Sequence, residues 1–106
     1  MRTMYGIFLH KYTVFEGDGP ETCGHNFEIY CVINTLDEAY QNALLRYDTR
    51  LDELKKKFPK EDYYGEMKTE EYVKTNERSK FKIGYLVSGF MDKTYEEIWL
   101  QKMYMI

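Results

Sequence analysis

The sequence has few of the residues that stabilise small secreted domains, with two cysteines, two prolines and one tryptophan in 106 residues. Two cysteines are too few for the disulfide framework that such domains need. The first ten residues hold too short an apolar run for a signal peptide. No stretch approaches the roughly 18 to 20 apolar residues that span a bilayer. We therefore expect a cytoplasmic protein with reduced thiols and no membrane contact.

Aliphatic residues are also scarce. Leucine, isoleucine, valine and phenylalanine together make up 24 of the 106 residues. That share lies just above the roughly 20% below which chains tend to stay disordered. Eleven tyrosines supply further apolar surface, and each carries a polar hydroxyl. A chain of this length has room for about one domain. We predict a single domain over residues 1–106 with a core that is partly aromatic.

The chain carries no excess of positive charge, because 15 lysines and arginines face 18 acidic residues. The net charge of −3 excludes a generally basic nucleic-acid binder, and we expect no direct contact with nucleic acid. Between Tyr12 and Leu45 there are six acidic residues and no lysine or arginine. Cations gather instead along residues 46–60. This pattern is typical either of ordinary solvated faces or of a polarised surface that steers a partner.

Residues 2–15 and 26–34 predict two strands, because both are rich in aromatic and β-branched residues. Residues 16–24 contain three glycines and a proline, which predicts a loop between them. An antiparallel hairpin is the simplest arrangement. Strand alternation predicts that one face of the second strand carries Phe27, Ile29, Cys31 and Ile33.

The hydrophobic period then changes to three or four residues, which predicts one long helix from Leu36 to Phe58. Thr35 and Glu38 have the spacing of a capping box at its start. Three lysines in its last turn suit the helix dipole, and Pro59 ends it. The predicted buried stripe comprises Leu36, Tyr40, Ala43, Leu44, Tyr47, Leu51, Leu54 and Phe58.

The rest of the chain is harder to interpret. Residues 60–79 are polar and poorly patterned, and residues 66–78 fit either a helix or a strand. Residues 80–90 predict a strand whose alternating apolar residues are Phe81, Ile83, Tyr85 and Val87. Residues 94–106 fit a helix or a strand, and we favour the strand of a second hairpin. The expected fold is α+β: an antiparallel sheet of about four strands with one long helix on one face, in the order ββα-ββ.

Candidate chemistry is sparse. His10, Cys23, His25 and Cys31 have the side chains of a zinc site, but their spacing differs from the paired knuckles of zinc ribbons and fingers. Cys23 and His25 also permit Cys–His catalysis, although a polar loop tip explains them better. Glu96 and Glu97 are adjacent on a strand and should point to opposite faces. We therefore predict no metal, no cofactor and no catalytic residue.

The polar segment offers a candidate interface. Tyrosine is enriched in interface hot spots, and here tyrosines alternate with carboxylates that would suit a basic groove on a partner. The predicted partner-binding residues are Tyr63, Tyr64, Glu66, Glu70, Glu71 and Tyr72.

These features favour a non-catalytic protein that acts by protein–protein contact. Its size and acidity are typical of a phage- or mobile-element-encoded inhibitor of a larger, nucleic-acid-binding host protein. One alternative is a ligand-binding or regulatory module with a pocket between helix and sheet, lined by Tyr40, Tyr47 and Tyr85. A third is an enzyme or zinc protein that uses His10 and its three companions.

Overall fold

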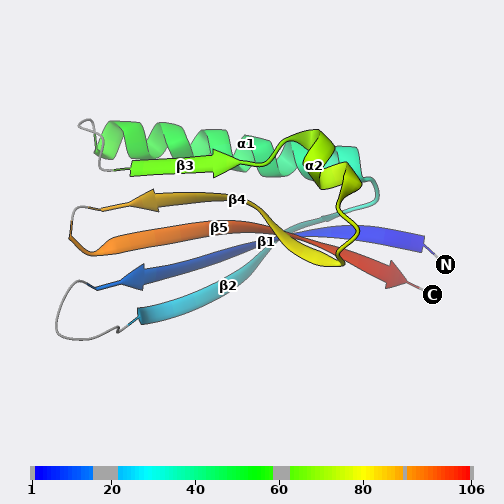
Figure 1. Ribbon diagram of the computed structural model, residues 1–106, viewed down its shortest axis with the longest axis horizontal. Helices are drawn as coiled ribbons and strands as arrows, with labels where there is room; N and C mark the ends of the chain where they lie inside the picture. The colour runs from blue at the N-terminus through cyan, green and yellow to red at the C-terminus, as the bar shows by residue number, and fades with distance from the viewer. Residues whose placement is uncertain (1, 16–21, 59–62, 90, 106) are drawn as a thin grey trace.

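The computed structural model of the protein describes residues 2–15, 22–58, 63–89 and 91–105, with the backbone alone at residues 22–25 and 105 (Figure 1). Its elements follow the order β1 (Arg2–Val14), β2 (Thr22–Ile33), α1 (Leu36–Lys57), β3 (Tyr63–Met67), α2 (Glu70–Thr75), β4 (Lys80–Ser88) and β5 (Lys93–Met105).

The strands form one antiparallel sheet in the order β2-β1-β5-β4-β3. The α+β class and both hairpins are confirmed, including the strand over the last residues of the chain. The expected number of about four strands is wrong, because β3 adds a fifth at the edge of the sheet. Its five residues come from the poorly patterned segment, and only pairing with β4 identifies them as a strand. The same segment then forms the short helix α2.

The molecule has two layers, since α1 packs on one face of the sheet (Figure 1). Ile7, Ile83, Ile98 and Leu100 form the sheet side of the core. On α1, Ala39 and Ala43 are fully buried, and their small side chains let the helix approach the strands closely. We call the covered side the helix face and the other side the open face.

The long helix begins where its sequence predicts. Thr35 is extended, and its Oγ1 accepts a hydrogen bond of 3.2 Å from the Glu38 amide. Tyr40 and Leu54 of the predicted stripe are buried, and Leu36, Leu44 and Tyr47 pack against the core. In the described parts of the chain, no helix combines the length and apolarity that crossing a bilayer requires.

A β-bulge in β2 overturns the predicted alternation of that strand. Ile7 pairs with Cys31, but the next residue, Phe8, pairs with Ile29, so Tyr30 is an extra residue. Because an inserted residue shifts the alternation by one, Cys31 and Ile33 lie on the helix face. Phe27 and Ile29 lie on the open face, and both are exposed. The prediction that all four residues share one face is therefore wrong.

A second bulge corrects the prediction for β4. The pairing with β5 shifts between Lys82 and Gly84. Phe81 pairs with Leu100 on the helix face, and Ile83 belongs to the same core. Tyr85 and Val87 pair with Glu97 and Tyr95 on the open face. Their predicted alternation is thus divided between the two faces of the sheet.

The packing of α1 predicts a sharp contrast between two of its leucines. Leu54 is buried on the side of α1 that faces the sheet, whereas Leu45, on the outer side of the same helix, is 62% exposed. We expect Leu54→Ala to lower the free energy of unfolding by about 2 to 5 kcal/mol, because it leaves a cavity. Leu45→Ala should change it by less than about 0.5 kcal/mol. Chemical denaturation measures both; equal effects would contradict this placement of the helix.

Candidate functional site

The open face is rich in aromatic side chains at its centre. The register places Phe8, His10 and Tyr12 of β1 beside Trp99, Glu97 and Tyr95 of β5, respectively. These residues alternate along the two central strands, so their side chains emerge on the same face. Aromatic rings therefore line the middle of the surface that α1 leaves uncovered.

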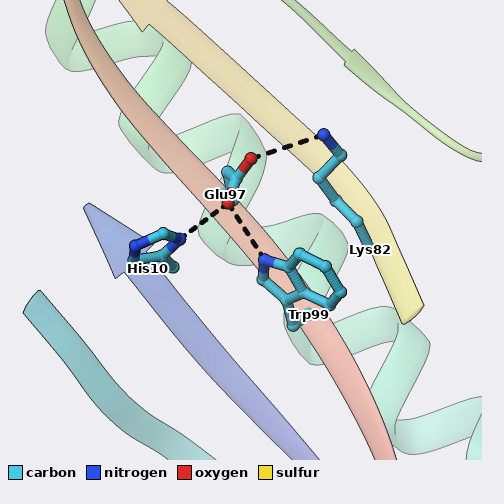
Figure 2. Close-up of polar contacts among 4 residues, drawn as sticks. All are labelled: His10, Lys82, Glu97 and Trp99. Atoms are coloured by element: carbon cyan, nitrogen blue, oxygen red, sulfur yellow. Dashed lines mark hydrogen bonds and ion pairs between the residues drawn. The ribbon is translucent and has the colours of Figure 1, made fainter. Parts of the chain in front are cut away.

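A polar cluster lies within this aromatic surface, with the Glu97 carboxylate at its centre (Figure 2). Oε1 accepts hydrogen bonds from His10 Nδ1 at 2.7 Å and from Trp99 Nε1 at 3.2 Å. Oε2 contacts Lys82 Nζ at 3.4 Å. The His10 and Glu97 side chains are each only 11% exposed. The cluster thus joins β1, β5 and β4 by polar contacts, of which the one with His10 is largely shielded from water, whereas Lys82 is 43% exposed.

These contacts decide the ionisation of Glu97. Burial by itself pushes the pKa of this carboxyl group up, since it penalises the charged form. The hydrogen bonds from His10 and Trp99 and the charge of Lys82 act in the opposite direction and outweigh burial. The pKa of Glu97 is therefore held below its ordinary value, and the group is a carboxylate at neutral pH.

Stacking contacts order the aromatic side chains around this cluster. The ring of Phe27 stacks on that of His10, with 4.0 Å between centroids and 2° between planes. Tyr12 stacks on Tyr95 at 5.0 Å. Lys80 Nζ lies 5.6 Å from the centre of the Phe27 ring and 5.9 Å from that of Trp99. Phe27 is therefore held in place by its neighbours although 57% of it is exposed.

The structure does not bring His10 and Cys31, two of the predicted metal ligands, to one site. His10 emerges on the open face, and Cys31 pairs with Ile7 on the helix face. The backbone of Cys23 lies in β2 opposite Thr13, which corrects its assignment to the loop. The side chains of Cys23 and His25 lie outside the described residues. Among the side chains that are described, no three potential ligands gather around a common point.

The predicted partner-binding residues lie together at the other edge of the sheet, on β3 and α2. Tyr64 and Glu66 emerge on the open face, opposite Val87 and Tyr85 of β4. Lys68 joins the two elements, since its Nζ lies 3.2 Å from Glu66 Oε1 and 5.3 Å from the centre of the Tyr72 ring. Tyr63 is half-buried and pairs with Ser88 on the helix face, so it separates from Tyr64.

An ion-pair network joins α2 to α1. Lys74 of α2 has its Nζ 2.8 Å from Oδ1 of Asp37 on α1 and 3.3 Å from Oε1 of Glu70 on its own helix, so one cation pairs with two carboxylates. The hydrogen bond and the charge of Lys74 lower the pKa of Asp37 below its ordinary value. Glu71 is exposed on the same short helix.

A cavity of about 70 Å³ lies between α1 and the sheet. Tyr47 lines it, as the pocket hypothesis requires, but the other two predicted tyrosines do not. Tyr40 is buried in the core and donates a hydrogen bond to the Lys68 carbonyl, and Tyr85 is on the open face. Arg50 lines the cavity too, but its Nε donates to both oxygens of Glu96, at 2.8 and 3.0 Å.

Comparison with protein-family models, with curated proteins and with solved structures finds no match to this chain.

Sequence reasoning missed the Glu97 cluster. It did predict that Glu96 and Glu97 point to opposite faces, and this is confirmed by their contacts with Arg50 and His10. The missing information was the partner: His10 and Glu97 are 87 residues apart in the chain. The sequence does place Glu97 two residues before Trp99, the single tryptophan, so that both share a face of the strand. That spacing does not indicate which residue of another strand contacts Glu97.

The lowered pKa of Glu97 predicts how stability responds to acid. A carboxyl group whose pKa is depressed by folding stabilises the native state above its unfolded pKa, and this contribution is lost as the pH falls through its folded pKa. We expect wild type to lose more stability than Glu97→Gln between about pH 6 and pH 3. Denaturant unfolding at several pH values measures this difference; parallel stability curves would contradict the role of the ionised group.

Proposed function

We propose that this protein is a non-catalytic binding protein that acts by contact with another protein. The observation that carries the proposal is an exposed surface at the β3 edge that combines tyrosine side chains with carboxylates. We call it the acidic tyrosine surface; its members are Tyr64, Glu66, Glu70, Glu71 and Tyr72.

The geometry supports one surface that wraps around the β3 edge, from Tyr64 and Glu66 on the open face to Tyr72 beside Phe81 on the helix side. β3 and α2 are separated by two residues only, and Lys68 between them contacts both Glu66 and Tyr72. The ring of Tyr72 also meets Phe81 edge-on at 6.3 Å, so it is anchored on the sheet while remaining exposed. Rigid, amphipathic tyrosines supply contact area at low entropic cost, which is why they are frequent in hot spots.

The charge of this region favours a basic partner. Three carboxylates belong to the acidic tyrosine surface, and Asp37 and Glu38 in the first turn of α1 are exposed nearby. Lys68 and Lys74 pair with some of these five carboxylates, and Lys93 Nζ lies 5.7 Å from the centre of the Tyr64 ring, which leaves a surplus of two negative charges. Such a surplus attracts a positively charged groove and repels an acidic one.

A protein that uses its own basic groove to bind nucleic acid has the complementary chemistry. We therefore take the partner to be a larger nucleic-acid-binding protein of the same cytoplasm, which this chain inhibits by occupying the groove. By analogy of size and acidity, we take a phage or mobile element to be the source of this inhibitor. This chain needs no cofactor and no metal for such a role, because the contact itself is the activity.

Removing the tyrosine side chains should abolish tight binding. The full chain and the variant Tyr64→Ala/Tyr72→Ala serve as paired baits in an extract of the source cells, with Tyr104→Ala, an exposed tyrosine on β5, as the matched control. We expect a protein that wild type and the control retain and the double variant loses. With that protein purified, calorimetry should show binding weakened by at least about 2 kcal/mol. Equal retention by all three baits would contradict the proposal.

Reversing charge should act on the rate of association rather than on the fold. Glu70 and Glu71 lie at the rim of the surface, where charges steer a partner over distances of about a Debye length. We expect Glu70→Lys/Glu71→Lys to slow association and to reduce its dependence on salt, with a smaller effect on dissociation. Binding kinetics at two salt concentrations measure both rates; an unchanged association rate would show that this charge does not guide the partner.

A further inference from the structure

The opposite edge of the sheet carries an exposed apolar strand. β2 is the outermost strand on that side and runs for 12 residues, Thr22–Ile33. Exposed large hydrophobic side chains follow one another along it, namely Phe27, Ile29, Tyr30 and Val32. Glu28 is its single charged residue, and it contains no lysine, arginine or proline.

Such an edge is poorly protected against pairing with another chain. Natural proteins shield edge strands with lysines, prolines or short lengths, because free backbone amides and carbonyls invite a further strand. The other edge strand of this sheet, β3, follows that rule, since it has five residues only and exposes Glu66. β2 is more than twice as long and has no lysine or proline, so its bulges and the exposed Glu28 are its protections along the described residues.

We propose that β2 pairs antiparallel with β2 of a second copy of this chain, about a two-fold axis at Phe27, to form a continuous ten-stranded sheet. The axis is perpendicular to the sheet, so both copies of α1 lie on the same face of it. This proposal is independent of the acidic tyrosine surface, which lies at the far edge of the sheet.

The position of the axis follows from the register of β2. Between its two bulges the strand is regular over the four residues Asn26–Ile29. Two residues that pair across antiparallel strands have their side chains on the same face, whereas neighbouring residues of one strand point to opposite faces. A two-fold axis between two neighbours would pair them with each other, so the axis must instead lie at one residue, which pairs with its own counterpart. Only an axis at Phe27 or at Glu28 pairs three residues within the regular stretch. An axis at Glu28 would oppose two like charges, which is unfavourable.

The axis at Phe27 also gives complementary charges. It places Glu28 of each copy opposite Asn26 of the other, on the helix face. Asn26 pairs on its inner side with the exposed Lys11 of β1. The Glu28 carboxylate of each copy thus lies beside the Asn26 amide of the other copy, and the Lys11 ammonium group of that copy lies one strand further away. The same contact is formed twice, as a two-fold interface requires.

The aromatic side chains of this interface are already ordered by contacts within each copy. The two Phe27 rings would meet on the axis, and each is already stacked on His10 and flanked by Lys80 in its own copy. Tyr30 lies against the guanidinium of Arg46, 5.8 Å from ring centre to Cζ. Side chains that are ordered before association lose little rotamer freedom when they bind.

The first test is the mass of the protein in solution. Sedimentation equilibrium should give twice the chain mass of 12.8 kDa, with dissociation on dilution. Ile29→Lys should return the protein to the monomer and weaken self-association at least about tenfold, because it places a lysine on the apolar edge. The matched control is Leu45→Lys, since Leu45 on α1 is 62% exposed and Ile29 is 63% exposed. The control should remain a dimer.

The second test concerns the register. Glu28→Lys places a lysine within reach of Lys11 of the other copy and should weaken the dimer, and adding Lys11→Glu should restore it. In a background of Cys23→Ser and Cys31→Ser, mild oxidation should link Phe27→Cys to itself across the axis, because paired Cα atoms lie about 4.5 to 5.5 Å apart. Leu45→Cys in the same background should not be linked.

The results that overturn the proposal are distinct. A wild-type chain that stays monomeric up to about 100 μM would exclude pairing with a second copy, and the edge would then take a strand from a different protein. A dimer that Ile29→Lys leaves intact would place the interface elsewhere. Circular dichroism and thermal melting of each variant show whether its own fold is retained. Neither result would bear on the acidic tyrosine surface, whose test uses other residues.

Discussion

The whole structure depends on the pairing between the first and last strands of the chain. All thirteen residues of β1, from Arg2 to Val14, pair with β5 without a bulge, and the two strands lie at the centre of the sheet. This ladder closes a loop of nearly the entire chain, so it carries the largest loop-closure entropy of the strand pairings in the sheet. It also sets which side chains meet α1: Ile7 and Leu9 face the helix with Leu100 and Ile98.

Regular pairing at the centre and bulges at the flanks explain the surface of the molecule. The bulges in β2 and β4 each shift the side-chain alternation by one residue. In β2 the shift turns Phe27 and Ile29 away from the core. In β4 it carries Tyr85 to the open face, beside Glu97. The bulges thus add Phe27 and Tyr85 to an open face whose central aromatic side chains come from the regular pairing of β1 with β5.

The two proposed surfaces lie at opposite edges of the sheet, and this arrangement is compatible with both. β2 provides an apolar edge for a second copy, and β3 with α2 provides an acidic, tyrosine-bearing edge for another protein. In a two-fold assembly the acidic tyrosine surfaces would lie at the outer ends of the joined sheet. Between them the Glu97 cluster ties three strands together and keeps the open face ordered.

The sequence alone determined the local features of this protein, and the tertiary structure decided the rest. Helix α1 was predictable because its apolar period, its Thr35 cap and its terminal lysines all act within a few residues. The tyrosines and carboxylates of the candidate interface were visible as composition, but the contacts of Lys68 and Lys74 with them were not. Strand β3, the two bulges and the contact between His10 and Glu97 depend on pairing partners far along the chain. Register is a property of two segments at once, so no single segment of the sequence states it.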